Sequence, residues 1–391
     1  MIPGPVEVSP GVTEAFGRKP PSHLAPPFIE SFGACIEMMR RVWLAGPDAQ
    51  PFVVAGGGTV AMDMAAANLT GPGDRVLVVN TGYFSDRMGE MLRRRGATVV
   101  NVGAAVGDAP DESTVREAAG RPGSLRAIFA THVDTSTGVR IDPGPLAAVA
   151  RDAGALLVVD GVCATAAERF DMRGLGADVY LTASQKAIGL PPGLALLVVT
   201  ERALEARRTA DAPPPMYLDW EQWQPVMRAY EERRPSYFST PATNLVLGLE
   251  VGLREILVDG MEARFAMHET GARAMRAAWS ALGLEAVPVR RGLLAHTLSA
   301  LRYPPGTDAG LVRTIAKHGV VVAGGLHPQI RETYFRVGHM GYASTQTEML
   351  RRTVLAVGAA LGEAGARVDP ERAWSAAAAS LESLNGAHLD S

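Results

Sequence analysis

The sequence predicts a large α/β protein with a mainly parallel β-sheet, followed by a smaller α+β domain. The chain has 391 residues, which is enough for two domains and a sizeable core. Hydrophobic residues make up 47% and charged residues 20% of it, as suits a folded globular protein. Short apolar runs alternate with helical patterns. That alternation is typical of β-α-β units, and hence of parallel strands.

Strand-like runs recur through the first half of the chain. The first leads into a glycine triplet at 56–58, and the Ala/Met-rich stretch after the triplet is expected to be helical up to Asn68. Proline-rich segments at 212–215 and 233–236 predict long loops after the sheet ends. The other expected strands of the large sheet are 75–79, 97–102, 125–130, 156–159, 179–182 and 194–199.

A helical pattern from Asn244 is expected to lead into the smaller domain. Strands are expected there at 295–301, 319–323 and 335–337, and the tail from Arg367 to Ser391 reads as one amphipathic helix with a frayed end. The expected units are an N-terminal segment 1–20, a large domain 21–250, a small domain 251–365 and a C-terminal helical tail 366–391.

Composition and charge argue against several classes of protein. The formal net charge of −3 offers no basic surface for nucleic acid. Cys35 and Cys163 cannot build a disulfide framework, and Cys163 is expected to be a small packing residue. The sequence shows neither a secretory leader nor an apolar run of membrane-spanning length. We therefore expect a cytoplasmic protein without nucleic-acid or membrane partners.

Lys186 is the first candidate for a catalytic residue. Only Lys19, Lys186 and Lys317 are lysines among 38 basic residues, so arginine supplies the surface charge. Lys186 lies within the apolar stretch 179–193. A lysine amine can lose its proton and form a Schiff base with a carbonyl, and burial lowers its pKa in the direction that this chemistry needs. The alternative is a lysine at a strand end with its ammonium group in water.

Asp160 follows a continuous apolar run, Ala155–Val159, of the kind found in strands buried on both faces. Ligands of open α/β sheets bind beyond the carboxyl ends of the strands, where Asp160 would project. A strand-terminal aspartate before a Schiff-base lysine suggests pyridoxal 5'-phosphate, because that cofactor needs an acid partner on its pyridine nitrogen. The alternative role for Asp160 is a helix cap or turn former.

The glycine triplet Gly56–Gly58 is a candidate phosphate cradle. An apolar strand precedes it and a helical stretch follows, so backbone N–H groups at the helix start would face a phosphate. A dinucleotide site is disfavoured because the G-x-G-x-x-G pattern is absent here. An ordinary strand-to-helix turn is the alternative for the triplet taken alone.

Six motifs then occur in order along the chain. They are Gly56-Gly-Gly-Thr59, Thr131-His-Val-Asp-Thr-Ser-Thr137, Val159-Asp-Gly-Val-Cys163, Thr182-Ala-Ser-Gln-Lys-Ala187, Tyr237-Phe-Ser-Thr240 and Arg336-Val-Gly-His-Met-Gly341. With them the chain, from about residue 2 to about residue 360, resembles the class V aminotransferases. The likeness is to the alanine-glyoxylate and serine-glyoxylate group, and most of all to its fungal type. The resemblance implies the pyridoxal-phosphate-dependent fold type I, with a mainly parallel mixed sheet sandwiched by helices.

The resemblance also implies a role for each matched residue. Lys186 would hold pyridoxal 5'-phosphate as a Schiff base and Asp160 would bind its pyridine nitrogen. Phe84 and Val162 would pack on the two ring faces, and Thr135 would bond the phenolic oxygen. Gly57, Gly58, Thr59 and Gln185 would bind the phosphate, joined by Tyr237 and Thr240 of the other subunit of a homodimer. One departure is Gly57, where relatives often have serine, so a hydroxyl contact to the phosphate is in doubt.

Arg336 would clamp the substrate carboxylate through a bidentate fork. The implied activity moves an amino group from L-alanine to glyoxylate, with small amino acids and 2-oxo acids as the substrates and no metal. Serine-glyoxylate and 2-aminoethylphosphonate-pyruvate transfer are the alternatives. A class V lyase or desulfurase would need a catalytic cysteine in a C-terminal loop, and no cysteine follows Cys163. A non-catalytic cofactor-binding regulator would need a DNA-binding module, for which no segment is spare.

Overall fold

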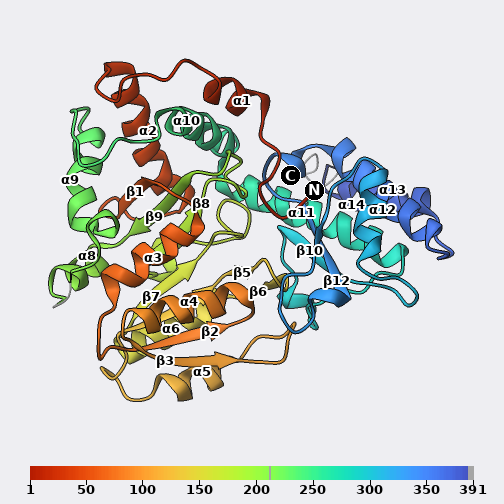
Figure 1. Ribbon diagram of the computed structural model, residues 1–391, viewed down its shortest axis with the longest axis horizontal. Coiled ribbons are helices and arrows are strands. Elements are labelled where there is room, and N and C mark those ends of the chain that lie inside the picture. Colours follow the sequence, from red (N-terminus) through yellow and green to blue (C-terminus); the bar gives the residue numbers. More distant parts are fainter. Residues whose placement is uncertain (211–212, 386–391) are drawn as a thin grey trace.

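A seven-stranded sheet forms the centre of the larger part of the molecule in the computed structural model, which describes residues 1–210 and 213–385 (Figure 1). The strand order is β1-β9-β8-β7-β4-β2-β3, and β9 runs antiparallel to both of its neighbours while the other pairs are parallel. The mainly parallel sheet is therefore confirmed. The strands are β1 (Gln50–Ala55), β2 (Arg75–Asn80), β3 (Thr98–Gly103), β4 (Ala127–Thr131), β7 (Leu156–Asp160), β8 (Val179–Ala183) and β9 (Leu194–Val199).

The four strands β4, β7, β8 and β9 are buried along their whole length. Their continuous apolar sequences suit strands covered on both faces. An alternating pattern would instead place every second, polar residue in the core. The flanking helices are α2 (Pro26–Val42), α3 (Gly58–Leu69), α4 (Tyr83–Arg94), α5 (Glu112–Ala119), α6 (Pro143–Ala153), α7 (Met172–Leu175), α8 (Glu201–Arg208), α9 (Trp220–Glu231) and α10 (Thr243–Leu257), with α1 (Pro10–Phe16) packed on α10. A short hairpin joins β5 (Val133–Asp134) to β6 (Val139–Arg140).

Helix boundaries follow local chemistry. The Asp142 side chain accepts a hydrogen bond from the backbone N–H of Gly144, and Pro143 stands in the first helical turn of α6. Gly154 ends the same helix in the left-handed conformation that glycine adopts readily. Caps of this kind satisfy backbone groups that the helix itself leaves unpaired.

The segment between β9 and α10 differs from the expectation of long loops. Pro213–Pro215 and residues 233–236 do lie in connections, but helices α8 and α9 stand beside them, and Ala212 lies outside the described residues. The sequence analysis missed α9, whose buried face includes Trp220 and Tyr230. The prediction of loops rested on the proline content of the segment. Proline does not exclude a helix here, because Pro225 lies inside α9.

The smaller part of the molecule contains a three-stranded antiparallel sheet of order β10-β12-β11 (Figure 1). Its strands are β10 (Leu298–Arg302), β11 (Ala323–Gly324) and β12 (Tyr334–Gly338), and its helices are α11 (Gly260–Ala281), α12 (Gly310–Lys317), α13 (Thr347–Glu363) and α14 (Pro370–Asn385). The smaller part also contains the short 3-10 turns η2 (Arg291–Leu293), η3 (Arg331–Thr333) and η4 (Gly341–Thr345). A further 3-10 turn, η1 (Met216–Leu218), packs against α3 in the larger part.

The prediction of a strand at residues 319–323 is mostly wrong. Only its last residue, Ala323, belongs to a strand. Val320 and Val322 are buried while Val321 is exposed, so the alternation of a strand is present without a partner strand. The expected tail helix is confirmed as α14 over 370–385, and the last six residues lie outside the described part of the chain.

Two hydrophobic cores share helix α11. Met261 and Phe265, in its first turns, pack in the core around the large sheet, while Ala274 and Met275 pack in the core around the small sheet. A single continuous helix therefore connects the two cores. In the small core, α14 packs against α11 and α13.

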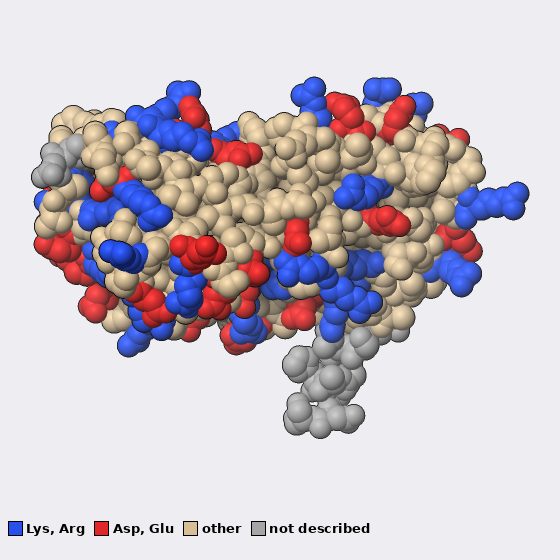
Figure 2. Space-filling model, turned by 90° about the horizontal axis from the view of Figure 1, so that it is seen from below, with Lys and Arg blue, Asp and Glu red and all other residues tan. Residues whose placement is uncertain are grey.

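The surface carries charges of both signs, interspersed over the face drawn in Figure 2, with a group of basic side chains near its middle. Among the helices of the described residues, none is both long enough and apolar enough to cross a bilayer.

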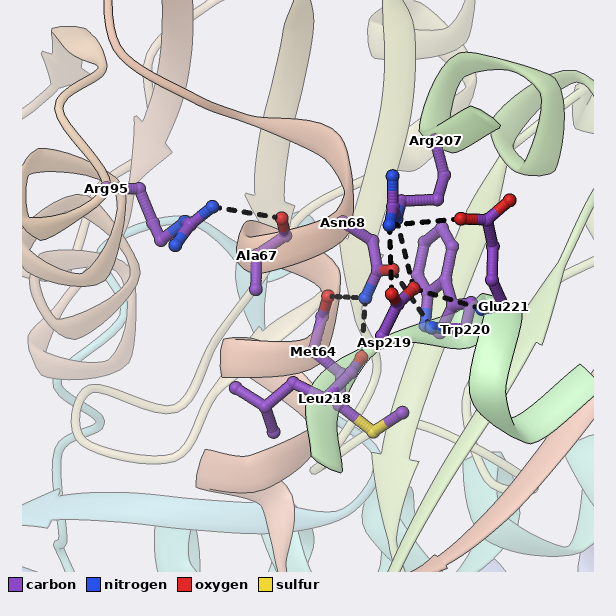
Figure 3. Close-up of polar contacts among 9 residues, drawn as sticks. All are labelled: Met64, Ala67, Asn68, Arg95, Arg207, Leu218, Asp219, Trp220 and Glu221. Carbon is purple, nitrogen blue, oxygen red and sulfur yellow. Dashed lines mark hydrogen bonds and ion pairs between the residues drawn. The ribbon is translucent and has the colours of Figure 1, made fainter. Parts of the chain in front are cut away.

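A buried polar network anchors the C-terminal end of α3 (Figure 3). The Asn68 side-chain amide donates to the carbonyls of Met64 and Leu218 and accepts from the N–H of Trp220. Beside it, the buried Arg207 guanidinium forms two hydrogen bonds with Asp219, at 3.0 and 2.9 Å. The network fixes the helix whose other end carries the glycine triplet.

We expect Arg207→Met to lower the free energy of unfolding by about 3 to 5 kcal/mol, because Asp219 would stay buried without its cation. The double variant Arg207→Met with Asp219→Leu should recover most of that loss. Urea denaturation followed by circular dichroism measures both. Arg254→Met, which removes an exposed pair with Glu250, is the control and should cost at most about 0.5 kcal/mol. Equal losses at the two positions would contradict this account.

Candidate active site

The predicted site residues gather at the carboxyl edge of the large sheet. Asp160 is the last residue of β7, and Lys186 lies in the connection that follows β8. Gly57 and Gly58 follow β1, and Thr135 lies in the hairpin after β4. Because the carboxyl ends of parallel strands share one edge, these segments, far apart in sequence, converge there.

Lys186 is buried, with 9% of its surface exposed. Its amine donates a hydrogen bond to the backbone carbonyl of Pro3. Burial lowers the pKa of Lys186, and the nearby charge of Arg336 acts in the same direction, while Cys163 and Asp160 oppose them. The expected burial of the amine is thus met, and the alternative of an ammonium group in water is wrong.

Asp160 is buried as well, and its Oδ1 accepts a hydrogen bond from the N–H of Val162 at 2.9 Å. Burial raises the pKa of Asp160 to about 7, and the neighbouring Asp134 carboxylate adds to that rise. Lys186 and Arg87 lie near enough to act against it. A carboxylate in this setting is stabilised by a further positive partner.

Asp134 is a site residue to which the sequence analysis assigned no role. It is fully buried and accepts hydrogen bonds from the backbone N–H groups of Phe84 and Ser85, at 3.1 and 3.3 Å. The N–H and hydroxyl of Ser136 also donate to it, at 2.9 and 2.6 Å. Asp134 therefore holds the start of α4, and with it Phe84, against the hairpin. Its position shortly after a buried strand was the available signal.

The glycine triplet forms the start of α3. Gly57 is the N-cap in an extended conformation and Gly58 is the first helical residue, so N–H groups of the first turn lack helical partners. The hydroxyl of Thr59 accepts a hydrogen bond from Arg87 at 3.1 Å. A Cβ atom on Gly57 would meet no atom within 4 Å, so the serine common in relatives would fit. The arrangement suits an anion.

Phe84 and Val162 are both half-buried. The Phe84 ring packs edge-on against Tyr83 and lies under the guanidinium of Arg87, 5.2 Å from the ring centre. Val162 approaches the start of α3, since a Cβ on Gly58 would lie 3.0 Å from its Cγ2 atom. Arg87 thus connects the phosphate cradle with Phe84, which the motifs alone did not indicate.

Arg336 comes from β12 of the small sheet. Its guanidinium donates to the carbonyls of Gly324 and Thr135, at 2.9 and 3.1 Å. Burial lowers its pKa. Within the described residues no carboxylate lies at ion-pair distance from Arg336, so its partners are backbone carbonyls only. A half-buried guanidinium without an acidic partner can bind an incoming carboxylate.

Tyr237 and Thr240 are not brought to the site by their own chain. Both are exposed, Tyr237 to 65%, and the Tyr237 ring contacts that of His23, with the ring centres 5.7 Å apart. Of the two motif histidines, His132 is buried against Tyr180 and His339 against Ser299, which are structural positions.

The N-terminal segment covers Lys186, which the sequence analysis also missed. Besides the Pro3 contact, the N–H of Val6 donates to the carbonyl of Gln185 at 3.1 Å. Gly4 has φ of +107°, and a Cβ there would lie 2.6 Å from the Lys186 amine. Only glycine allows this close approach.

The residues present fit pyridoxal 5'-phosphate. Asp160 is a buried carboxylate that has no ion-pair partner among the described residues, and Lys186 is a buried amine. The buried Oε1 atom of Gln185 has no hydrogen-bond partner among the described residues. Gly57 is the N-cap of α3, where backbone N–H groups of the first turn would suit a phosphate. A phosphate, an aldehyde and a basic ring nitrogen each find complementary groups here.

Comparison with known proteins gives the same picture. Residues 29–327 match the family model described as aminotransferase class-V. The chain is 34% identical to alanine–glyoxylate aminotransferase 1 of Saccharomyces cerevisiae, over 87% of this chain and 91% of that protein. It is also 34% identical to an L-aspartate–glyoxylate aminotransferase of Paracoccus denitrificans, covering 87% and 86% of the two chains.

Among solved structures, pyridoxamine-pyruvate aminotransferase from Mesorhizobium loti superposes with a TM-score of 0.91 at 26% identity, over 98% of this chain and 96% of that one. The expected fold type I architecture is thereby confirmed. From the matched residues and the fold together, this chain belongs to the class V aminotransferases.

Proposed function

We propose that this protein transfers the amino group of L-alanine to glyoxylate, giving pyruvate and glycine. The coarser function is that of its family, a pyridoxal 5'-phosphate-dependent aminotransferase. One observation carries the choice of substrates. Arg336 is a single guanidinium bound to carbonyls only, and it suits the one carboxylate that L-alanine and glyoxylate each possess.

Bound in this site, the cofactor supplies an aldehyde for the amino group and a cationic ring that withdraws electrons from the substrate Cα. The residues of the chain do the rest. The Lys186 amine, with its pKa lowered by burial, would take a proton from the substrate Cα and deliver it to the carbon that was the aldehyde of the cofactor. Asp160 holds a proton on the ring nitrogen. Pro3 and Gly4 cover the amine and limit the room above it.

Substrate size separates the alternatives. Serine adds one hydroxyl to alanine, which a small pocket rejects only weakly. Aspartate and 2-aminoethylphosphonate carry a second anionic group. Arg87, the charged residue beside the cradle, already binds Thr59 and Tyr83. The relative from P. denitrificans nevertheless makes L-aspartate a second candidate donor.

We also propose a homodimer whose subunits share their sites. Tyr237 and Thr240 are exposed on a segment that follows α9, where a second subunit can use them for its own phosphate. We further propose domain boundaries near residues 20, 250 and 365. We also propose a cytoplasmic location.

Lys186→Ala should abolish transamination and the visible absorption of the purified protein, while Lys317→Ala, an exposed lysine on α12, should leave both unchanged. Mixing Lys186→Ala with a Tyr237→Ala, Thr240→Ala double variant should restore activity, because each hybrid dimer contains one site with intact residues. Absorption spectra and coupled assays measure this. Full activity of Lys186→Ala would refute its role, and a fully active monomer in sedimentation would refute the shared site.

Asp160→Asn should lower kcat by orders of magnitude, because a neutral amide cannot hold the ring cation. A second readout is the pH dependence of the free energy of unfolding, measured on the cofactor-free protein. The folded pKa of about 7 lies above the unfolded value, so the folded state binds the extra proton and stability is lost as pH rises from about 4 to about 7. Across this pH range the free energy of unfolding of the wild type should fall by up to about 4 kcal/mol more than that of Asp160→Asn. The control is Asp152→Asn, on the surface. Parallel pH profiles for the wild type and Asp160→Asn would count against this placement.

Arg336→Lys should weaken L-alanine and glyoxylate alike, by about 1.5 to 3 kcal/mol in kcat/KM, since both lose the same charge-assisted hydrogen bonds. Arg313→Lys, exposed on α12, is the matched control. A panel of donors with glyoxylate should rank L-alanine first, L-serine second, and aspartate and 2-aminoethylphosphonate last. Loss of only one half-reaction, or a donor other than alanine at the top, would overturn the proposed pair.

A further inference from the structure

A cavity of about 520 Å³ lies outside the predicted site, between α11, the turn η2 and strand β10. Its lining includes Gly138 of the β5–β6 hairpin, so residues of both parts of the chain form its walls. The volume falls within the range of small-molecule sites. None of its lining residues belongs to the cofactor or substrate groups described above.

The ionisable side chains that line the cavity are all of basic residue types. Arg273 and Arg276 come from α11, Arg291 from η2, and His296 from the segment before β10. The lining contains no aspartate or glutamate. Glu168 is the nearest buried carboxylate, and it pairs with His296 at 2.9 Å and with Arg140 at 3.8 Å. Neither of these two partners is one of the three arginines of the cavity.

The three arginines have no carboxylate at ion-pair distance within the described residues. Arg276 is half-buried and donates only to the carbonyl of Ala295, at 3.3 Å. Arg273 has a long contact of 3.5 Å with Thr270. Elsewhere on the surface, arginines such as Arg116 and Arg233 each bind two carboxylates. Unpaired guanidinium groups around a cavity favour an anionic occupant.

The other half of the cavity is apolar. Trp279, Leu284, Leu298 and Leu301 line it and are buried in the protein. The indole N–H of Trp279 donates to Ser299 at 3.0 Å, so its polar atom is already satisfied. An occupant that used the whole cavity would therefore need an apolar body as well as a negative charge.

The cavity lies one strand away from Arg336. Ala300, which lines the cavity, is paired with Arg336 in the antiparallel register of β10 and β12. Gly138 belongs to the same hairpin turn as Thr135, whose carbonyl accepts from Arg336. A ligand that holds α11 against β10 would therefore act on the strand that positions the substrate carboxylate.

We propose that this cavity binds a small organic anion, a carboxylate on an apolar body, through Arg273, Arg276 and Arg291. The site is distinct from that of Lys186, and its occupation changes the affinity of the enzyme for its amino-acid substrate through β10 and β12. The binding itself does not depend on which amino donor the enzyme uses.

The test uses the holoenzyme and three probes, measured by titration calorimetry and tryptophan fluorescence. The probes are 4-phenylbutyrate, which has both charge and apolar body, 4-phenylbutanol, which has only the body, and inorganic phosphate, which has only the charge. We expect 4-phenylbutyrate to bind once per chain, at least about tenfold more tightly than either of the others. Its fluorescence signal should be lost in Trp279→Phe.

Arg276→Gln and Arg291→Gln should each weaken 4-phenylbutyrate by about tenfold, whereas Arg313→Gln on α12 should not. Arg291 is exposed, so its variant remains informative if Arg276→Gln fails to fold. Arg336→Lys should leave this binding unchanged and 4-phenylbutyrate should shift the KM for the donor in the wild type. Binding that is lost in Arg336→Lys but kept in Arg276→Gln would place the probe in the substrate site and overturn the proposal, as would no binding at millimolar concentration.

Discussion

The burial of charge at the carboxyl edge of the large sheet is the constraint on which the rest of the site depends. Lys186, Asp160 and Asp134 are all buried there. Removing such groups from water is costly unless each finds a partner, and the pKa values move accordingly, upward for Asp160 and downward for Lys186. Asp134 is satisfied by backbone N–H groups and Ser136. Asp160 and Lys186 have fewer partners in the chain, and under the proposed function a cofactor with a basic ring and an aldehyde would supply a partner to each.

The frame around this edge is held by polar groups that do no chemistry. Asp134 fixes the start of α4, and the network of Asn68, Arg207 and Asp219 fixes the end of α3. These two helices present Phe84 and the glycine triplet. Each helix is thus fixed at one end by buried polar contacts, which helps to keep the residues it carries within the small tolerance that catalysis requires.

The small sheet brings Arg336 and the N-terminal segment to the edge where Lys186 lies. β12 carries Arg336 to the carbonyl of Thr135, and the N-terminal segment joins the same sheet because the N–H of Gly338 donates to the carbonyl of Met1. The same segment covers Lys186. Movement of the small sheet would therefore shift both Arg336 and the segment that covers the Lys186 amine. The basic cavity beside β10 lies where a ligand could influence such movement.

Local sequence determined much of this protein. Continuous apolar runs predicted the strands of the large sheet, and the isolated Lys186, the strand-terminal Asp160 and the glycine triplet predicted a cofactor and its phosphate site, because strand polarity alone brings such positions to one edge. The two-residue strand β11, the helix α9 and the full length of α11 were not predicted, since each depends on what packs against it. Tertiary structure alone decided the contact of Pro3 with Lys186, the capping of α4 by Asp134 and the arginine-lined cavity. Each of these features joins residues that lie far apart in the chain, and a local sequence pattern does not predict which distant residues come into contact.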